Sequence, residues 1–302
     1  MDSSSSEFSY GFTRLVLGDS TFLPMSEEDY HQLLADKAVL LAVLDVEEAF
    51  DVLIENFLEF EKACLSVAAD HMIHTSLEYV YYQGVRRNLA RKLSNVLTSA
   101  RFYIDLIPRL HNELHGDDSA EPDIKADLSS EYDRRLGYRV MEAIRNHAQH
   151  RGLPAHGVSV GGQWKDDELV FTLTLRINTA ELARDGHFKR TVLDELNALG
   201  RKVDVRPFVM DYLAGLMTVH EKFRSHHEAK VRASEQRLTN AIKNCDAQGM
   251  TSNVGLAIVK RDARGVAVVK EQLFDEIVEY RHELVGLNAH FANFQKRHVS
   301  GR

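Results

Sequence analysis

Arginine and histidine side chains recur at helical spacing between Glu131 and Pro154. At about 100° per residue, Arg145, Asn146 and His150 fall on one polar side of a helix in this stretch. Histidine titrates near neutrality and can act as base or acid, whereas arginine offers a permanent, forked set of donors that matches phosphate. Because Asn146 lies one turn before His150, it can orient the imidazole or a phosphate. The pattern predicts a site for phosphate chemistry.

RNA cleavage without a metal needs these side-chain types. A base must activate a ribose 2′-hydroxyl, a cation must stabilise the charge on the phosphoryl oxygens, and an acid must protonate the leaving oxygen. We expect Arg145 to supply the cation and His150 to act as base or acid. One histidine cannot easily do both, so we expect two copies of the chain, in a homodimer, to complete the site.

The other residues of this helix divide by polarity. The polar side also carries Arg135, Tyr138, Arg139, Glu142 and Gln149, and the apolar side carries Leu136, Val140, Ala143, Ile144, His147 and Ala148. We expect Arg139, Glu142 and Gln149 to support the site, and His147 to be a core or interface histidine. The alternative is a solvated polar face linked by pairs one turn apart, with His150 capping the helix end.

A short pattern near the predicted helix end resembles the signature of HEPN domains. It consists of Arg145, Asn146, three further residues and then His150. The resemblance implies a helical bundle over residues 26–156 and a dimeric, metal-independent endoribonuclease with Arg145 and His150 catalytic and Asn146 supporting them. It also implies a composite cleft across the dimer, and a setting in phage defence or a toxin–antitoxin system with an antitoxin or regulatory partner. Some members carry a modifiable tyrosine shortly after the histidine; here Arg151–Leu153 follows, so that regulation is not supported.

Basic residues elsewhere suggest where RNA, including tRNA, would bind. The candidates are Arg86, Arg87, Arg91, Arg135 and Arg151. A groove lined by them would attract phosphates in a chain whose net charge is −8. The alternative is a solvated basic face paired with acidic neighbours. A second function class also stays open, namely a non-catalytic HEPN-like scaffold or a module that binds a nucleotide or a protein partner.

Composition narrows the class of protein. The 302 residues include only 17 Gly and 5 Pro, which excludes collagen-like and low-complexity chains and favours helices. Cys64 and Cys245 are too few for a disulfide framework and suggest a reducing compartment. No apolar run in the sequence approaches the length of roughly 20 residues that a membrane span needs, and the N-terminus lacks a signal-peptide pattern. We therefore expect a soluble, cytoplasmic protein that does not associate with membranes.

Histidine spacing also raises the question of a metal. His71 and His74 with Asp70, and His111 with His115, have spacings that can share a metal on one helix face. Neither group has an obvious third and fourth ligand. With no glycine-rich phosphate loop or cysteine motif in the sequence, we expect neither a metal nor another cofactor.

Periodicity and turn residues predict a mainly α fold, a HEPN-like helical bundle with long helices and one or two small β-hairpins. We expect an N-terminal tail with a short strand (1–25), the bundle (26–156), and a hairpin plus C-terminal helices (157–302) that can pack with the bundle as one domain. Expected helices are 26–75 with a break near Asp45, 77–115, 129–151, 180–199, 206–248 and 271–298. Expected hairpins are 158–175, turning at Gly161-Gly162, and 254–269.

Overall fold

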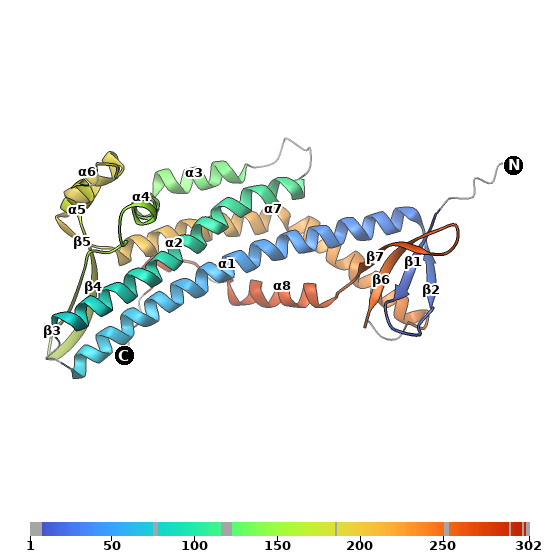
Figure 1. Cartoon of the computed structure of the whole chain (residues 1–302), viewed down its shortest axis with the longest axis horizontal. Coiled ribbons are helices and arrows are strands. Elements are labelled where there is room, and N and C mark those ends of the chain that lie inside the picture. Colours follow the sequence, from blue (N-terminus) through green and yellow to red (C-terminus); the bar gives the residue numbers. More distant parts are fainter. Residues whose placement is uncertain are drawn as a thin grey trace. The chain divides into compact units, whose positions relative to one another are not determined.

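The computed structural model describes residues 8–74, 78–115, 123–184, 186–250, 254–289, 291–297 and 299. Within these residues the chain is mainly α, 66% helical, with two small antiparallel sheets (Figure 1). This confirms the mainly α class. The expected tail at residues 1–7 lies outside the described residues. None of the described helices combines the length and the apolar character that crossing a bilayer would require.

The chain forms two compact units, each built from segments far apart in sequence. Unit 1 comprises residues 1–47 and 225–287, and unit 2 comprises residues 48–224 and 288–302. Two long helices, α1 (Glu27–Ile73) and α7 (Arg206–Ala247), each supply residues to both units.

Unit 1 contains a four-stranded antiparallel sheet in the order β2-β1-β6-β7. Its elements besides α1 and α7 are β1 (Phe8–Arg14), β2 (Phe22–Met25), β6 (Leu256–Asp262), β7 (Ala267–Gln272) and α8 (Glu276–Leu287). The hairpin predicted at 254–269 is confirmed. Asp36 of α1 is buried and accepts hydrogen bonds from Ser234 and Arg237 of α7, at 2.8 Å each, which links the two helices inside this unit.

Unit 2 carries the segment with the Arg-Asn-His pattern. It contains α2 (Tyr79–His115), α3 (Ile124–Arg134), α4 (Leu136–His150), β3 (Gly157–Lys165), β4 (Glu168–Asn178), α5 (Thr179–Arg184), α6 (Arg190–Leu199), β5 (Lys202–Asp204) and the short 3-10 helix η1 (Phe294–Lys296). The sheet order is β3-β4-β5. Helix α4 contacts α2, α3 and α6.

The long helix α1 runs without the break predicted near Asp45. Its start is confirmed, because the hydroxyl of Ser26 accepts a hydrogen bond from the amide of Asp29 at 3.0 Å, as an N-cap residue does. Asp45 is exposed while Val46 and Phe50 are fully buried. The acidic residue therefore lies on the solvent side of a continuous apolar stripe and interrupts nothing.

The helix predicted at 129–151 is two helices. Backbone dihedrals of −109° and 121° at Arg135 end α3 and begin α4. The guanidinium of Arg135 bonds to Glu131 at 2.6 Å and to Asp211 of α7 at 2.8 Å, and the second carboxylate oxygen of Asp211 accepts the amide of Gly137 at 2.9 Å. These tertiary bonds stabilise the break, and local helical periodicity does not reveal them.

The first hairpin of unit 2 is present, but its turn is not at the glycine pair. Gly161 and Gly162 lie inside β3, where a Cβ on Gly162 would meet the side chain of Leu169 at 2.9 Å. The turn is at Asp166-Asp167, with Asp166 at φ 54°, a left-handed conformation that Asp tolerates. The glycine therefore provides space for Leu169 on the facing strand.

Three further predictions of element bounds were wrong. The single N-terminal strand is the pair β1 and β2. The helix at 180–199 is divided into α5 and α6, with Gly186 between them at φ 65°. The last helix does not begin at Glu271, because β7 extends to Gln272 and pairs there with β6; α8 spans only Glu276–Leu287.

Candidate functional site

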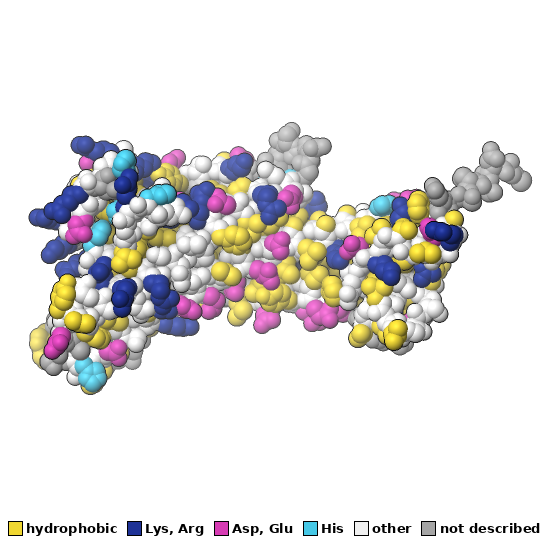
Figure 2. All heavy atoms as spheres, viewed as in Figure 1, with side chains coloured by type: hydrophobic (Ala, Val, Ile, Leu, Met, Phe, Trp, Pro, Cys, Tyr) yellow, Lys and Arg dark blue, Asp and Glu magenta, His cyan; other side chains and the backbone are white. Residues whose placement is uncertain are grey.

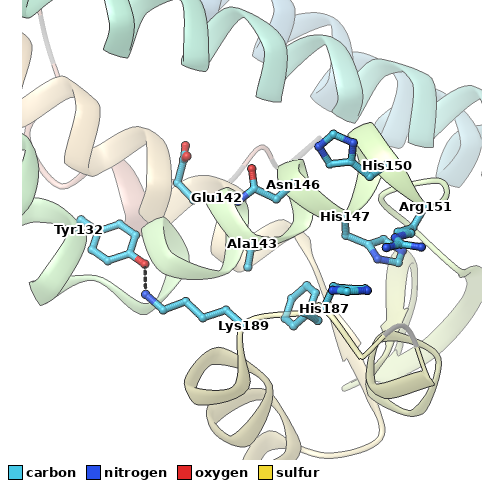
Figure 3. A pocket seen from close by; sticks show the side chains of 10 residues that line it. Tyr132, Glu142, Ala143, Asn146, His147, His150, Arg151, His187 and Lys189 are labelled. Atoms are coloured by element: carbon cyan, nitrogen blue, oxygen red, sulfur yellow. Dashed lines mark hydrogen bonds between the residues drawn. The ribbon is translucent and has the colours of Figure 1, made fainter.

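A pocket of about 310 Å³ lies against the C-terminal half of α4 in unit 2 (Figure 3). Its lining residues come from α3, α4 with its end, and the segment joining α5 to α6. They are Tyr132, Glu142, Ala143, Asn146, His147, His150, Arg151, His187, Phe188 and Lys189. The volume is at the low end of the roughly 300–1,000 Å³ of small-molecule sites. The pocket is therefore large enough only for a small ligand or a small part of a larger one.

Two rows of α4 side chains contribute to this pocket. Residues four apart lie above one another on a helix, so Glu142, Asn146 and His150 form one row and Ala143, His147 and Arg151 the next. In Figure 3 the first row projects from one side of α4, and the second row projects toward the segment that carries His187 and Lys189. The pocket therefore receives imidazole groups from both sides of the helix end.

Helix α4 is held against α7 at its first turn. A Cβ on Gly137 would lie 2.6 Å from the carbonyl oxygen of Phe208, so the two backbones approach as closely as glycine permits. Tyr138 packs edge-on against Tyr212, with ring centroids 4.8 Å apart, and is 3% exposed. The prediction that Tyr138 belongs to the polar side was wrong, because α7 covers this part of α4.

The segment after Gly186 is anchored through Phe188 and Lys189. Phe188 is 9% exposed, and its ring lies 6.3 Å from that of His147. The ammonium of Lys189 donates to the hydroxyl of Tyr132 at 2.6 Å. A salt bridge of 2.9 Å between Arg139 and Glu195 also joins α4 to α6. His187, which directly precedes these anchors, is exposed at the pocket.

Of the three residues predicted to carry the chemistry, two line the pocket and one lies beside it. Asn146 and His150 are exposed and line the pocket. Arg145 does not line it; its guanidinium donates to the side-chain oxygen of Asn146 at 3.2 Å. The structure thus joins Arg145 to the pocket through Asn146.

Of the two environments expected for His147, core or interface, the structure excludes the core. Its side chain is partly exposed and lines the pocket next to His150. Its ring lies 6.1 Å from that of His156, and a backbone amide, that of Asn178, donates to Nδ1 of His156 at 3.0 Å. Burial lowers the pKa of His156, and the neighbouring His147 and Arg86 lower it further, against the opposite effect of Glu181. His156 therefore binds a proton less readily than an exposed imidazole, and its ring lies beside that of the pocket residue His147.

The expected supporting residues have three different environments. Arg139 is engaged with Glu195 and with the backbone oxygen of Asp133 at 2.6 Å. Glu142 accepts a hydrogen bond from the hydroxyl of Tyr212 at 2.7 Å. Burial raises the pKa of Tyr212 well above its ordinary value, so this hydroxyl remains a donor. Gln149 is exposed and outside the pocket lining.

The five predicted RNA-binding arginines have different surroundings. Arg151 lines the pocket, and Arg87 is exposed on α2. Arg86 donates to Gln83 at 3.1 Å and Arg91 to Asn88 at 3.1 Å, both along α2. Arg135 lies between the carboxylates of Glu131 and Asp211, so its charge is paired with theirs and stabilises the break between α3 and α4.

A different basic surface lies beside the pocket. Figure 2 shows Lys and Arg side chains gathered over the α5–α6 part of unit 2. Among its residues, Arg184, Lys189 and Arg190 are exposed. Lys189 also lines the pocket, so this surface reaches the imidazole groups. Sequence reasoning missed Tyr132, His187, Phe188 and Lys189, because no spacing rule connects α3 or α4 with a segment beyond a β-hairpin.

The histidine pair predicted on α2 does come together. The rings of His111 and His115 have centroids 4.3 Å apart and an interplanar angle of 68°. His111 is 3% exposed. This pair could offer two imidazole nitrogens to a metal, and it belongs to α2 and not to the pocket. Comparison of the chain with protein-family models, curated proteins and solved structures finds no match.

Proposed function

We propose that the chain is a metal-independent endoribonuclease of the HEPN type, which cleaves RNA in the α4 pocket of unit 2. The observation that supports this most directly is the lining itself. His147, His150 and His187 meet there with the cations of Arg151 and Lys189. Imidazoles near neutral pH supply acid–base chemistry, and the two cations match a phosphodiester.

The proposed reaction is attack of a ribose 2′-oxygen on the adjacent phosphorus. A base removes the 2′-hydroxyl proton, and His150 is the candidate from the motif. Asn146, bonded to Arg145 at 3.2 Å, positions the phosphate, while Arg151 and Lys189 stabilise the charge on its oxygens. The products are a 2′,3′-cyclic phosphate and a 5′-hydroxyl end.

The proposed substrate is single-stranded RNA or a loop, such as that of a tRNA. A pocket of about 310 Å³ has room for one nucleotide, and recognition of RNA with sequence preference targets unpaired nucleotides that can leave the stack. The basic surface over α5 and α6 lies where the flanking phosphates would run.

The test is an incubation with mixed tRNA and single-stranded RNA in EDTA, comparing wild type with His150→Ala. Loss of a general acid or base typically costs a factor of about 10²–10⁴, and we expect wild type to leave 2′,3′-cyclic phosphate ends. His74→Ala, an exposed histidine of unit 2 outside the pocket, is the matched control. Equal cleavage by His150→Ala and wild type would contradict the proposal, and nucleotide binding without cleavage would favour a binding module.

A further inference from the structure

We infer that His187 is the second proton-transfer residue of this site, so that a single chain carries both the acid and the base. The inference rests on the proposed RNA cleavage and adds a residue outside the Arg-Asn-His pattern. It also replaces the expectation that a second copy of the chain must supply the missing imidazole.

The position of His187 is fixed by its neighbours in the chain. Gly186, at φ 65°, turns the backbone, and its amide donates to the carbonyl of Ala183 at 3.3 Å. Phe188 is buried beside His147, and the ammonium of Lys189 is bonded to Tyr132. Because the two residues that follow His187 are anchored to α4 and α3, its exposed imidazole is held at the pocket.

His187 and His150 approach the pocket from different directions. In Figure 3, His150 projects from one side of α4, and His187 lies on the other side, where His147 and Arg151 project. In a displacement at phosphorus the attacking and leaving oxygens are roughly in line, on opposite sides of the phosphorus. The base and the acid of such a step therefore reach the substrate from different directions, and His150 and His187 line the one pocket from different sides of α4.

The proton balance of the step needs no other reactant. One imidazole of the pair takes the proton from the 2′-hydroxyl as the bond between the 2′-oxygen and phosphorus forms. The bond between phosphorus and the 5′-oxygen breaks, and the other imidazolium gives its proton to that oxygen. The pair then exchanges one proton with water to regain its initial state.

The first experiment compares wild type, His150→Ala and His187→Ala, with His74→Ala as control, at several pH values. We expect His187→Ala to lose a factor of about 10²–10⁴ in rate, and one limb of the bell-shaped pH profile, without a change in melting temperature. Free imidazole should restore part of its rate, which a purely structural role would not allow. Cleavage by His187→Ala at the wild-type rate overturns the inference, whereas a wild type without activity overturns the proposed function itself.

The second experiment mixes the two inactive variants after denaturation and joint refolding. If His150 and His187 act within one chain, no mixed assembly contains an intact pair, and the mixture stays inactive. If each site combined His150 of one chain with His187 of another, mixed dimers would recover activity. Recovery in the mixture would overturn the single-chain assignment.

Discussion

The hydroxyl of Tyr212 donates a hydrogen bond to Glu142, with 2.7 Å between the two oxygens, and thereby ties a pocket carboxylate to the core of unit 2. We expect Tyr212→Phe to lower the free energy of unfolding by about 1–2 kcal/mol, because the carboxylate loses a buried donor. The released carboxylate should also weaken RNA binding by repelling phosphate. Tyr10→Phe, which removes a hydroxyl bonded to Glu27 in unit 1, is the control. Equal RNA affinity of both variants in a filter-binding assay would show that the hydrogen bond between Tyr212 and Glu142 does not affect RNA binding.

The contact between α4 and α7 predicts a large difference between two glycine substitutions. A Cβ at Gly137 would lie 2.6 Å from the Phe208 carbonyl, whereas at Gly84 of α2 it would meet nothing within 4 Å. Gly137→Ala should therefore cost about 1–3 kcal/mol of stability, and Gly84→Ala should add about 0.5–1 kcal/mol. Urea unfolding of both variants measures this. Stability of Gly137→Ala at or above that of wild type would show that the helices can separate freely.

His156 predicts a pH dependence of stability. Because burial lowers its pKa below 6.5 in the folded state, the unfolded chain binds a proton more readily. The free energy of unfolding that depends on a neutral His156 is therefore fully present above pH 6.5. It is lost as the pH falls through 6.5 toward the pKa of His156 in the folded state. In His156→Asn, the side-chain oxygen can still accept the Asn178 amide but does not titrate. Urea unfolding at pH 7.5 and 5.5 should show a smaller loss for the variant, and an equal loss in both proteins would refute the assignment.

Arg151 predicts a change in the salt dependence of RNA binding. Each phosphate contact with a single strand contributes about 0.7 to the slope of log affinity against log salt. Arg151→Ala should reduce the slope by that amount. Arg109→Ala, which removes an exposed arginine paired with Glu113 on α2, should leave it unchanged. The measurement is a titration of fluorescent single-stranded RNA at several salt concentrations. An unchanged slope for Arg151→Ala would show that Arg151 contacts no RNA phosphate.

Helices with an uninterrupted apolar stripe could be predicted from sequence. The start of α1 at Ser26 followed from its capping residue, and the span of α7 followed from apolar residues at helical spacing. The end of α3 could not be predicted, because Arg135 is drawn out of helical geometry by Asp211, a residue far along the chain. Units that combine distant segments are equally hidden from local patterns.

The pocket was predictable only in the part that α4 contributes. Placing residues at helical intervals brought Asn146 and His150 to one side, and both line the pocket. The same reasoning assigned His147 to the core or to an interface. It could not show that His147 lines a pocket, because the segment with His187 that forms the other wall is positioned by tertiary contacts of Phe188 and Lys189. Exposure of a side chain depends on what the rest of the chain covers, and periodicity does not contain that information.

The pocket rests on the last turn of a helix, where the amide of Arg151 still bonds to the carbonyl of His147 at 2.9 Å. Helix ends open locally at low cost in free energy, so these amide protons should exchange with solvent faster than those of buried turns. A ligand that binds only the closed form slows this exchange in proportion to its concentration over Kd. Hydrogen exchange of residues 147–151 therefore reports occupancy of the pocket even for an inactive variant, and makes binding measurable apart from cleavage.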